Sequence, residues 1–234
     1  MFSLQRFFIL LMTVIIVSTA AAQGREMTVE ESYLQEAIEV MIIREFARSP
    51  TREQKLFALR HINEVVERDR GNTNDEIRQT LEFLALEGRR SVVRENGRVV
   101  NNFPDVRRQA AIYLGRIGTE EARRTLIEIL QYENEPMVLQ EAIKSLGEIE
   151  TTDFAAVNEI IFNISWVMSS SVNSYHSDNL MALATIDAFS NIARRNGGLN
   201  SPEAIRTLIS ISEGNYLTPV RERARQMLAQ LRRM

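Results

Sequence analysis

The sequence lacks cysteine altogether and contains only two histidines, five prolines and one tryptophan. Without cysteine the chain has no disulfides, no thiolate nucleophile and no cysteine metal ligand, so its stability must come from a packed core. Two histidines also provide little for catalytic or metal-binding clusters. The formal net charge of −3 excludes a global positive field that would attract nucleic acid. We therefore expect a non-enzymatic protein with no cofactor and no nucleic-acid partner.

The longest hydrophobic run lies near the N-terminus. Phe7 to Val17 follows Arg6 and precedes Ser18-Thr-Ala-Ala-Ala-Gln23. A positive residue, an apolar run and small residues in this order are typical of a secretory signal peptide. We predict a signal peptide over residues 1–22, cleaved near Ala22-Gln23, and a periplasmic or secreted mature domain over 23–234 with no transmembrane span. An uncleaved anchor is the alternative, because the run approaches membrane-spanning length only if Ala20 to Ala22 are included.

Two segments of the mature chain share a pattern of proline, valine, alanine, leucine-glycine and isoleucine. They are Phe103-Pro-Asp-Val-Arg-Arg-Gln-Ala-Ala-Ile-Tyr-Leu-Gly-Arg-Ile-Gly118 and Glu135-Pro-Met-Val-Leu-Gln-Glu-Ala-Ile-Lys-Ser-Leu-Gly-Glu-Ile-Glu150. Val106, Ala110 and Leu114 are spaced four residues apart, which places them in one stripe on a helix. One such helix cannot bury its stripe alone. Repeated copies therefore predict a helical solenoid, in which neighbouring units cover one another.

Similar stripes and turn residues predict most of the other elements. Helices are expected over 28–48, 51–68, 75–87, 105–117, 120–132, 136–149, 153–168 and 178–195, with two more that start at Ser201 and Thr218. Within an insertion at 88–103, valine pairs flank Asn96-Gly97, which predicts a small β-hairpin near 91–100. The Ser/Asn-rich stretch 169–177 is expected to be a loop. Trp166 is expected on the core face of its helix.

The repeated pattern closely resembles HEAT-like repeats of the phycobilisome-lyase type. The residues that carry the resemblance are Pro104, Val106, Arg107, Ala110, Leu114, Gly115, Ile117, Gly118, Ala122, Leu126 and Leu130. Pro136 to Gly147 and Pro219 to Leu231 also match well, whereas the segments near Pro50 and Asp178 match only in outline. The resemblance implies an all-α fold, a right-handed α-solenoid of about five HEAT-like helical hairpins. It says little about activity, because such repeats recur in scaffolds, adaptors, nucleic-acid enzymes and a few chromophore lyases.

Candidate partner-binding residues lie in the connections between successive helical pairs and in the β-hairpin. The six candidates are Phe103, Tyr132, Tyr175, Tyr216, Arg94 and Arg98. Large aromatic side chains with polar tips are common anchors in protein interfaces. The alternative for the four aromatic residues is that each packs between adjacent repeats and closes the core.

These observations favour a scaffold or adaptor that binds a protein partner in the bacterial periplasm or envelope. A first alternative is a HEAT-like lyase or ligand-handling enzyme, with Tyr175 and His176 beside a pocket. His61 is expected to be a surface or packed histidine. A second alternative is a structural protein that associates with the cell wall through the basic face of the last helix, formed by Arg221, Arg223, Arg225, Arg232 and Arg233.

Overall fold

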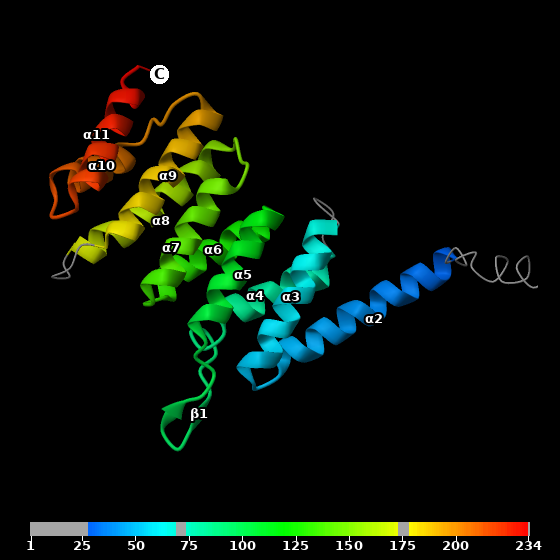
Figure 1. Ribbon diagram of the computed structural model, residues 1–234. Helices are drawn as coiled ribbons and strands as arrows, with labels where there is room; N and C mark the ends of the chain where they lie inside the picture. Colours follow the sequence, from blue (N-terminus) through cyan, green and yellow to red (C-terminus); the bar gives the residue numbers. More distant parts are fainter. Residues whose placement is uncertain (1–27, 69–73, 173–177, 234) are drawn as a thin grey trace, which may run out of the picture. The chain divides into compact units, whose positions relative to one another are not determined.

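The computed structural model describes residues 28–68, 74–172 and 178–233 (Figure 1). The chain divides into two units, residues 1–39 and 40–234. The predicted signal peptide and the candidate residues Tyr175 and His176 lie outside the described residues. The described part of the first unit is the first half of helix α2 (Val29–Arg48). This half begins with a capping box, in which the Glu31 N–H donates to Thr28 Oγ1 at 3.2 Å and the Thr28 N–H donates to the Glu31 carboxylate at 3.0 Å.

The second unit consists of the rest of α2, further helices and one pair of short strands. The helices are α3 (Arg52–Arg68), α4 (Asp75–Leu86), α5 (Pro104–Ile117), α6 (Glu120–Tyr132), α7 (Pro136–Glu148), α8 (Phe154–Val172), α9 (Asn179–Asn196), α10 (Pro202–Glu213) and α11 (Thr218–Leu231). Strands β1 (Arg94–Glu95) and β2 (Arg98–Val99) pair antiparallel. The predicted all-α architecture with a single small hairpin is confirmed for the described residues.

The helices of the second unit are arranged in two rows. Helices α3, α5, α7, α9 and α11 pack in succession in one row, and α4, α6, α8 and α10 pack in succession in the other. Figure 1 shows α5, α7 and α9 lying side by side. Each helix of the second row also packs against the helix of the first row that follows it in sequence. Every helical pair therefore contacts its neighbours, which is the arrangement of an α-solenoid.

The repeated apolar stripes form the core, as their spacing predicts. Val106, Ala110 and Leu114 of α5 are at most 1% exposed, and their counterparts on α7 are fully buried.

Helix ends also follow local sequence rules. Asp178 accepts hydrogen bonds from the backbone N–H groups of Leu180 and Met181 at the start of α9, and Gly118 ends α5 in the left-handed conformation, with φ of 66°.

Two glycines let the helices of the first row approach closely. A Cβ on Gly115 of α5 would lie 2.6 Å from Ser145 Cβ of α7, and a Cβ on Gly147 of α7 would lie 2.5 Å from Ala188 Cα of α9. Neither distance is possible for real atoms. The leucine-glycine pair of the repeat thus combines a buried side chain with a point of close contact between successive repeats.

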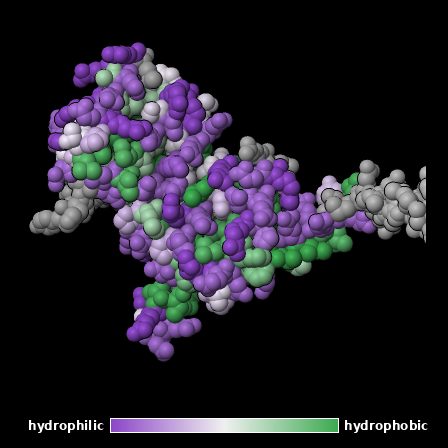
Figure 2. Space-filling model, in the orientation of Figure 1, coloured by the Kyte–Doolittle hydropathy of each residue, from purple (hydrophilic) through white to green (hydrophobic). Residues whose placement is uncertain are grey.

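The β-hairpin has the predicted turn. Asn96 and Gly97 have φ of 49° and 81°, as a type I′ turn requires, and Arg94 and Glu95 pair with Val99 and Arg98. The buried Asn101 holds its base, because its side chain accepts a hydrogen bond from the Val93 N–H at 2.9 Å and donates one to the Ser91 carbonyl at 2.7 Å. Figure 2 shows hydrophobic side chains at the base of the projection and hydrophilic ones at its tip.

The structure corrects one predicted boundary. Helix α8 continues to Val172, so the first residues of the expected loop 169–177 are helical, and residues 173–177 lie outside the described part of the chain. Serine can remain in a helix when its hydroxyl bonds to a carbonyl of the preceding turn. The hydroxyls of Ser169 and Ser170 both donate to the Trp166 carbonyl, at 2.8 and 2.9 Å, so the serines bond to the preceding turn while remaining helical.

Candidate protein-interaction surface

Helix α8 has partners on three sides. Ile160, Ile164 and Val167 are buried in the core. On the side of α6, the Asn163 amide oxygen accepts a hydrogen bond from Gln131 at 3.3 Å. On the side of α10, Met168 helps to line a pocket that α10 completes. Because successive helical residues are about 100° apart, these contacts leave one strip of α8 uncovered.

Two large aromatic side chains occupy this strip. Phe162 is 60% exposed and Trp166, one turn later, is 46% exposed. The prediction that Trp166 faces the core was wrong, because Ile164 and Val167 occupy the core positions on either side of it. We call Phe162 and Trp166 the α8 aromatic face. Tryptophan and other large aromatic residues are common among the side chains that dominate the energy of protein interfaces.

The helices beside the α8 aromatic face expose both polar and apolar side chains. Gln131 of α6 and Arg206 of α10 are exposed, and Arg206 is paired with Glu203 at 3.1 Å. Ile205 and Ile209 of α10 are each 40% exposed. Protein interfaces combine apolar and polar contacts of these kinds.

A small pocket lies between α8 and α10. It has a volume of about 190 Å³, and its walls include Met168, Ile211 and Tyr216. Tyr216, one of the predicted partner-binding residues, is only 8% exposed and belongs to the core. Burial raises the pKa of its hydroxyl, and the negative charge of Asp178 raises it further. The phenol therefore remains neutral at physiological pH.

The other predicted candidates lie in different environments. Tyr132 ends α6 and is 59% exposed, whereas Phe103 is partly buried and packs against the core at the start of α5. The alternative considered from the sequence, packing between repeats, thus describes Phe103 and Tyr216. Of the three candidates among the described residues, Tyr132 alone is exposed, and Tyr175 lies outside the described part of the chain. The α8 aromatic face was missed because an aromatic residue at helical spacing is consistent with either a core or a surface position.

The β-hairpin is a second exposed feature. All residues from 91 to 100 are exposed, including Arg94 and Arg98, which lie in the strands beside the turn. The Arg94 guanidinium donates to the Gly97 carbonyl at 3.2 Å and so stays close to the turn. The exposed valine pairs, Val92-Val93 before β1 and Val99-Val100 at the end of β2, are available for contact with another molecule.

A buried ion pair connects the end of the hairpin insertion to the end of α6. Arg107 Nε donates to Glu133 at 2.5 Å, both side chains are 1% exposed, and Arg107 also donates to the Asn102 side chain at 2.9 Å. Burial by itself would raise the pKa of Glu133. The hydrogen bonds from Arg107 and from the backbone N–H groups of Glu135 and Asn134 outweigh it, and the pKa lies below its ordinary value.

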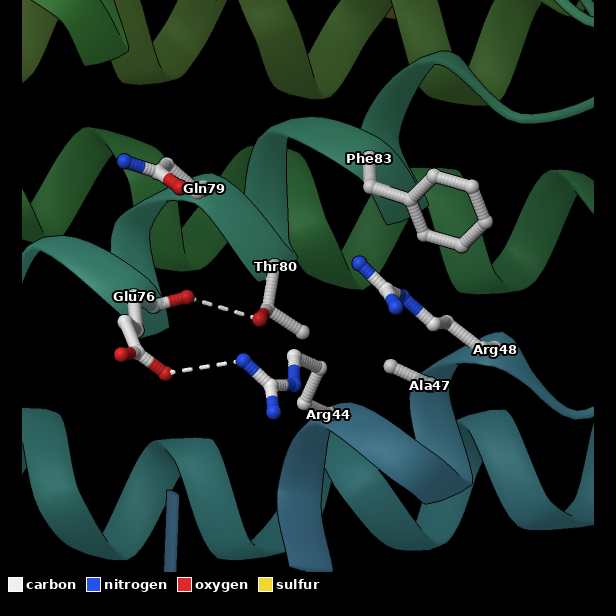
Figure 3. Close-up of a pocket in the computed structure, with 7 residues that line it drawn as sticks. All are labelled: Arg44, Ala47, Arg48, Glu76, Gln79, Thr80 and Phe83. Carbon is white, nitrogen blue, oxygen red and sulfur yellow. Dashed lines mark hydrogen bonds and ion pairs between the residues drawn. The ribbon is translucent and has the colours of Figure 1, made fainter. Parts of the chain in front are cut away.

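A polar pocket of about 230 Å³ lies between the last turns of α2 and the exposed face of α4 (Figure 3). Arg44 and Arg48 extend from α2 toward Glu76, Thr80 and Phe83 of α4. The Arg44 guanidinium is 3.3 Å from the Glu76 carboxylate, and the Thr80 hydroxyl donates to the Glu76 carbonyl at 2.7 Å.

The described residues contain no group of three or more potential metal ligands. His61 is packed edge-on against Phe57 and lies 3.4 Å from Glu64, as a surface or packed histidine would. Within the described ranges, no helix is long and apolar enough to cross a membrane.

A comparison with known protein families agrees with this architecture. Residues 98–157, from β2 to the start of α8, match the family of HEAT repeats. This segment consists of HEAT-like repeats. No curated protein matches the sequence. Among solved structures, the crystal structure of an engineered protein is 18% identical, with 82% of this chain and 80% of that chain covered and a TM-score of 0.48.

Proposed function

We propose that this HEAT-like repeat protein is a non-catalytic scaffold or adaptor that binds a protein partner in the bacterial cell envelope. HEAT repeats are protein-binding modules in general, and the α8 aromatic face carries the proposal for this chain. Phe162 and Trp166 remain exposed although the helix has partners on its other sides. The location rests on the signal-like segment before Gln23.

The proposed mechanism is geometric. The two aromatic side chains stand on a helix that both neighbouring repeats hold in place, so little ordering is needed when a partner binds. The pocket between α8 and α10 can accept one apolar side chain of the partner. Burying a large aromatic side chain contributes about 1.5–3 kcal/mol, so this pair can dominate an interface of ordinary size.

The first test is capture of the partner from envelope extract, followed by mass spectrometry. The variant Phe162→Ala/Trp166→Ala should lose a partner that the unaltered chain captures, and its melting temperature should change little because both side chains are exposed. Leu180→Ala is the matched control, since Leu180 is 60% exposed on α9, in the other row. Retention of every partner by the double variant would contradict the proposed surface.

The second test concerns location. The full chain, expressed in a bacterium, should be recovered from the periplasm or medium with its N-terminus near Gln23. Recovery of an intact Met1 in the cytosol would contradict the envelope assignment but would leave the binding proposal intact.

A further inference from the structure

The pocket in Figure 3 has an unbalanced positive charge. Arg44 and Arg48 are one helical turn apart on α2, so their guanidinium groups lie on the same side of the helix. Glu76, the acidic residue in the lining, pairs with Arg44. The Arg48 side chain forms no hydrogen bond or ion pair with any residue that the structure describes. Two guanidinium groups therefore face one carboxylate.

An apolar wall completes the pocket. Phe83 is 42% exposed, because Leu81, Leu84 and Ala85 occupy the buried positions of α4. The Lys55 ammonium lies 5.4 Å from the centre of the Phe83 ring. That ammonium is fully buried and already bound, to Glu87 at 2.7 Å and to the Ala47 carbonyl at 2.8 Å.

The ordinary explanation for Arg48 is its place in the last turn of α2, where a positive charge complements the negative end of the helix dipole. That explanation requires neither a pocket nor an exposed aromatic ring. It also predicts no effect of Glu76 on the binding of an anion. A ligand site does predict such an effect, because Glu76 would compete with an anionic ligand for Arg44.

We propose that this pocket binds a carboxylate carried next to an aromatic or other apolar group. Arg48 pairs with the carboxylate in the planar, two-bond geometry that guanidinium groups favour, and the Phe83 ring packs against the apolar part of the ligand. Gln79, which also lines the pocket, provides an amide for a further hydrogen bond. The site is independent of the α8 aromatic face, because it is built on α2 and α4.

Such a carboxylate occurs at the C-terminus of a peptide or in a free organic acid. The full chain is titrated with three probes: 3-phenylpropionate, the peptide Ala-Ala-Ala-Phe with a free C-terminus, and the same peptide with a C-terminal amide. Binding is followed by the backbone amide NMR signals of residues 44–48 and 76–83. Both carboxylates should shift these signals at millimolar concentration and the amide should not. Tighter binding of the peptide acid would assign a peptide C-terminus, and tighter binding of phenylpropionate a free acid.

Three variants distinguish ligand binding from a role of Arg48 in the helix dipole alone. Arg48→Gln should weaken binding about tenfold, as expected for loss of a charge-assisted hydrogen-bonded pair. Glu76→Gln should strengthen it about threefold, because it releases Arg44. Arg194→Gln, the same change at an exposed arginine of α9, should have no effect. Absence of shifts with both acids, unchanged binding by Arg48→Gln, or weaker binding by Glu76→Gln would each overturn the proposal, provided that circular dichroism shows folded variants.

Discussion

At the scale of single residues, buried charges link separate segments of the chain. Arg107 comes early in α5 and Glu133 follows α6, yet the two side chains meet in the interior. Glu133 also lies 2.5 Å from Arg89, near the start of the hairpin insertion. These contacts therefore hold together the start of α5, the end of α6 and the start of the hairpin insertion. Removing one partner of such a pair is costly because the other charge remains buried.

Replacement of Arg107 should destabilise the protein in a way that depends on pH. We expect Arg107→Met to lower the free energy of unfolding by about 3 kcal/mol at pH 7, since Glu133 keeps Arg89 and its backbone donors. The lowered pKa of Glu133 means that its carboxylate stabilises the folded chain above about pH 4.3, and that this contribution is lost as the pH falls through the folded-state value.

The difference between the unaltered chain and Arg107→Met should accordingly stay nearly constant from pH 7 to about pH 4.3 and shrink as the pH falls further, through the lower folded-state pKa of Glu133. Urea denaturation over this range measures it. The double variant Arg107→Met/Glu133→Gln should be more stable at pH 7 than the single variant, because it removes a buried carboxylate that has lost one of its two arginine partners. A difference that does not change with pH would show that lost packing, and not the buried carboxylate, is responsible.

At the scale of elements, the distance between successive helices depends on small residues. Gly115 faces Ser145, and Gly147 faces Ala188, so the contacts from α5 to α7 and from α7 to α9 involve pairs of small side chains. The leucine before each glycine is fully buried. Close helix contact and core packing are therefore encoded in two adjacent residues of the repeat.

Gly147→Ala tests this contact. Alanine stabilises a helix by about 1 kcal/mol relative to glycine, so local propensity alone predicts a more stable variant. The new Cβ would instead lie 2.5 Å from a backbone atom of α9, which cannot rotate away. We expect a net loss of about 1–3 kcal/mol in the free energy of unfolding, measured by chemical denaturation. A variant as stable as the unaltered chain would show that α7 and α9 do not approach so closely.

At the scale of the whole molecule, the second unit is held together by contacts between neighbours. Within the described residues, α7 packs against α5, α6 and α9, whereas α11 packs against α9 and α10. In arrays of this kind, stability is the sum of the repeats and the interfaces between adjacent repeats. Helices with fewer neighbours should therefore open more readily than those between two repeats.

Hydrogen exchange should reveal this gradient. We expect the amides of α7 around Leu139 to Leu146 to exchange more slowly than those of α11 around Val220 to Leu228. Mass spectrometry of exchange at neutral pH measures both segments in one experiment. Equal protection of α7 and α11 would indicate that the unit opens all at once, without the gradient that nearest-neighbour packing predicts.

Most of the fold could be predicted from the sequence because its signals are local and repeated. The spacing of Val106, Ala110 and Leu114 indicates a helix, its recurrence at Val138 indicates stacked helices, and Asn96-Gly97 determines the type of hairpin turn. Each signal depends on a few adjacent residues whose geometry is nearly independent of the rest of the chain. Periodicity and turn chemistry by themselves therefore determined the succession of helices and the position of the hairpin.

The exposed surfaces were decided by tertiary structure. Trp166 and Tyr216 are both aromatic residues near the ends of predicted elements, yet one is 46% exposed and the other 8%. Likewise, the charge of Arg48 is visible in the sequence, but its position opposite Phe83 depends on how α2 and α4 pack. The physical reason is that exposure depends on which distant helix covers a side chain, and no local pattern of residues records that neighbour.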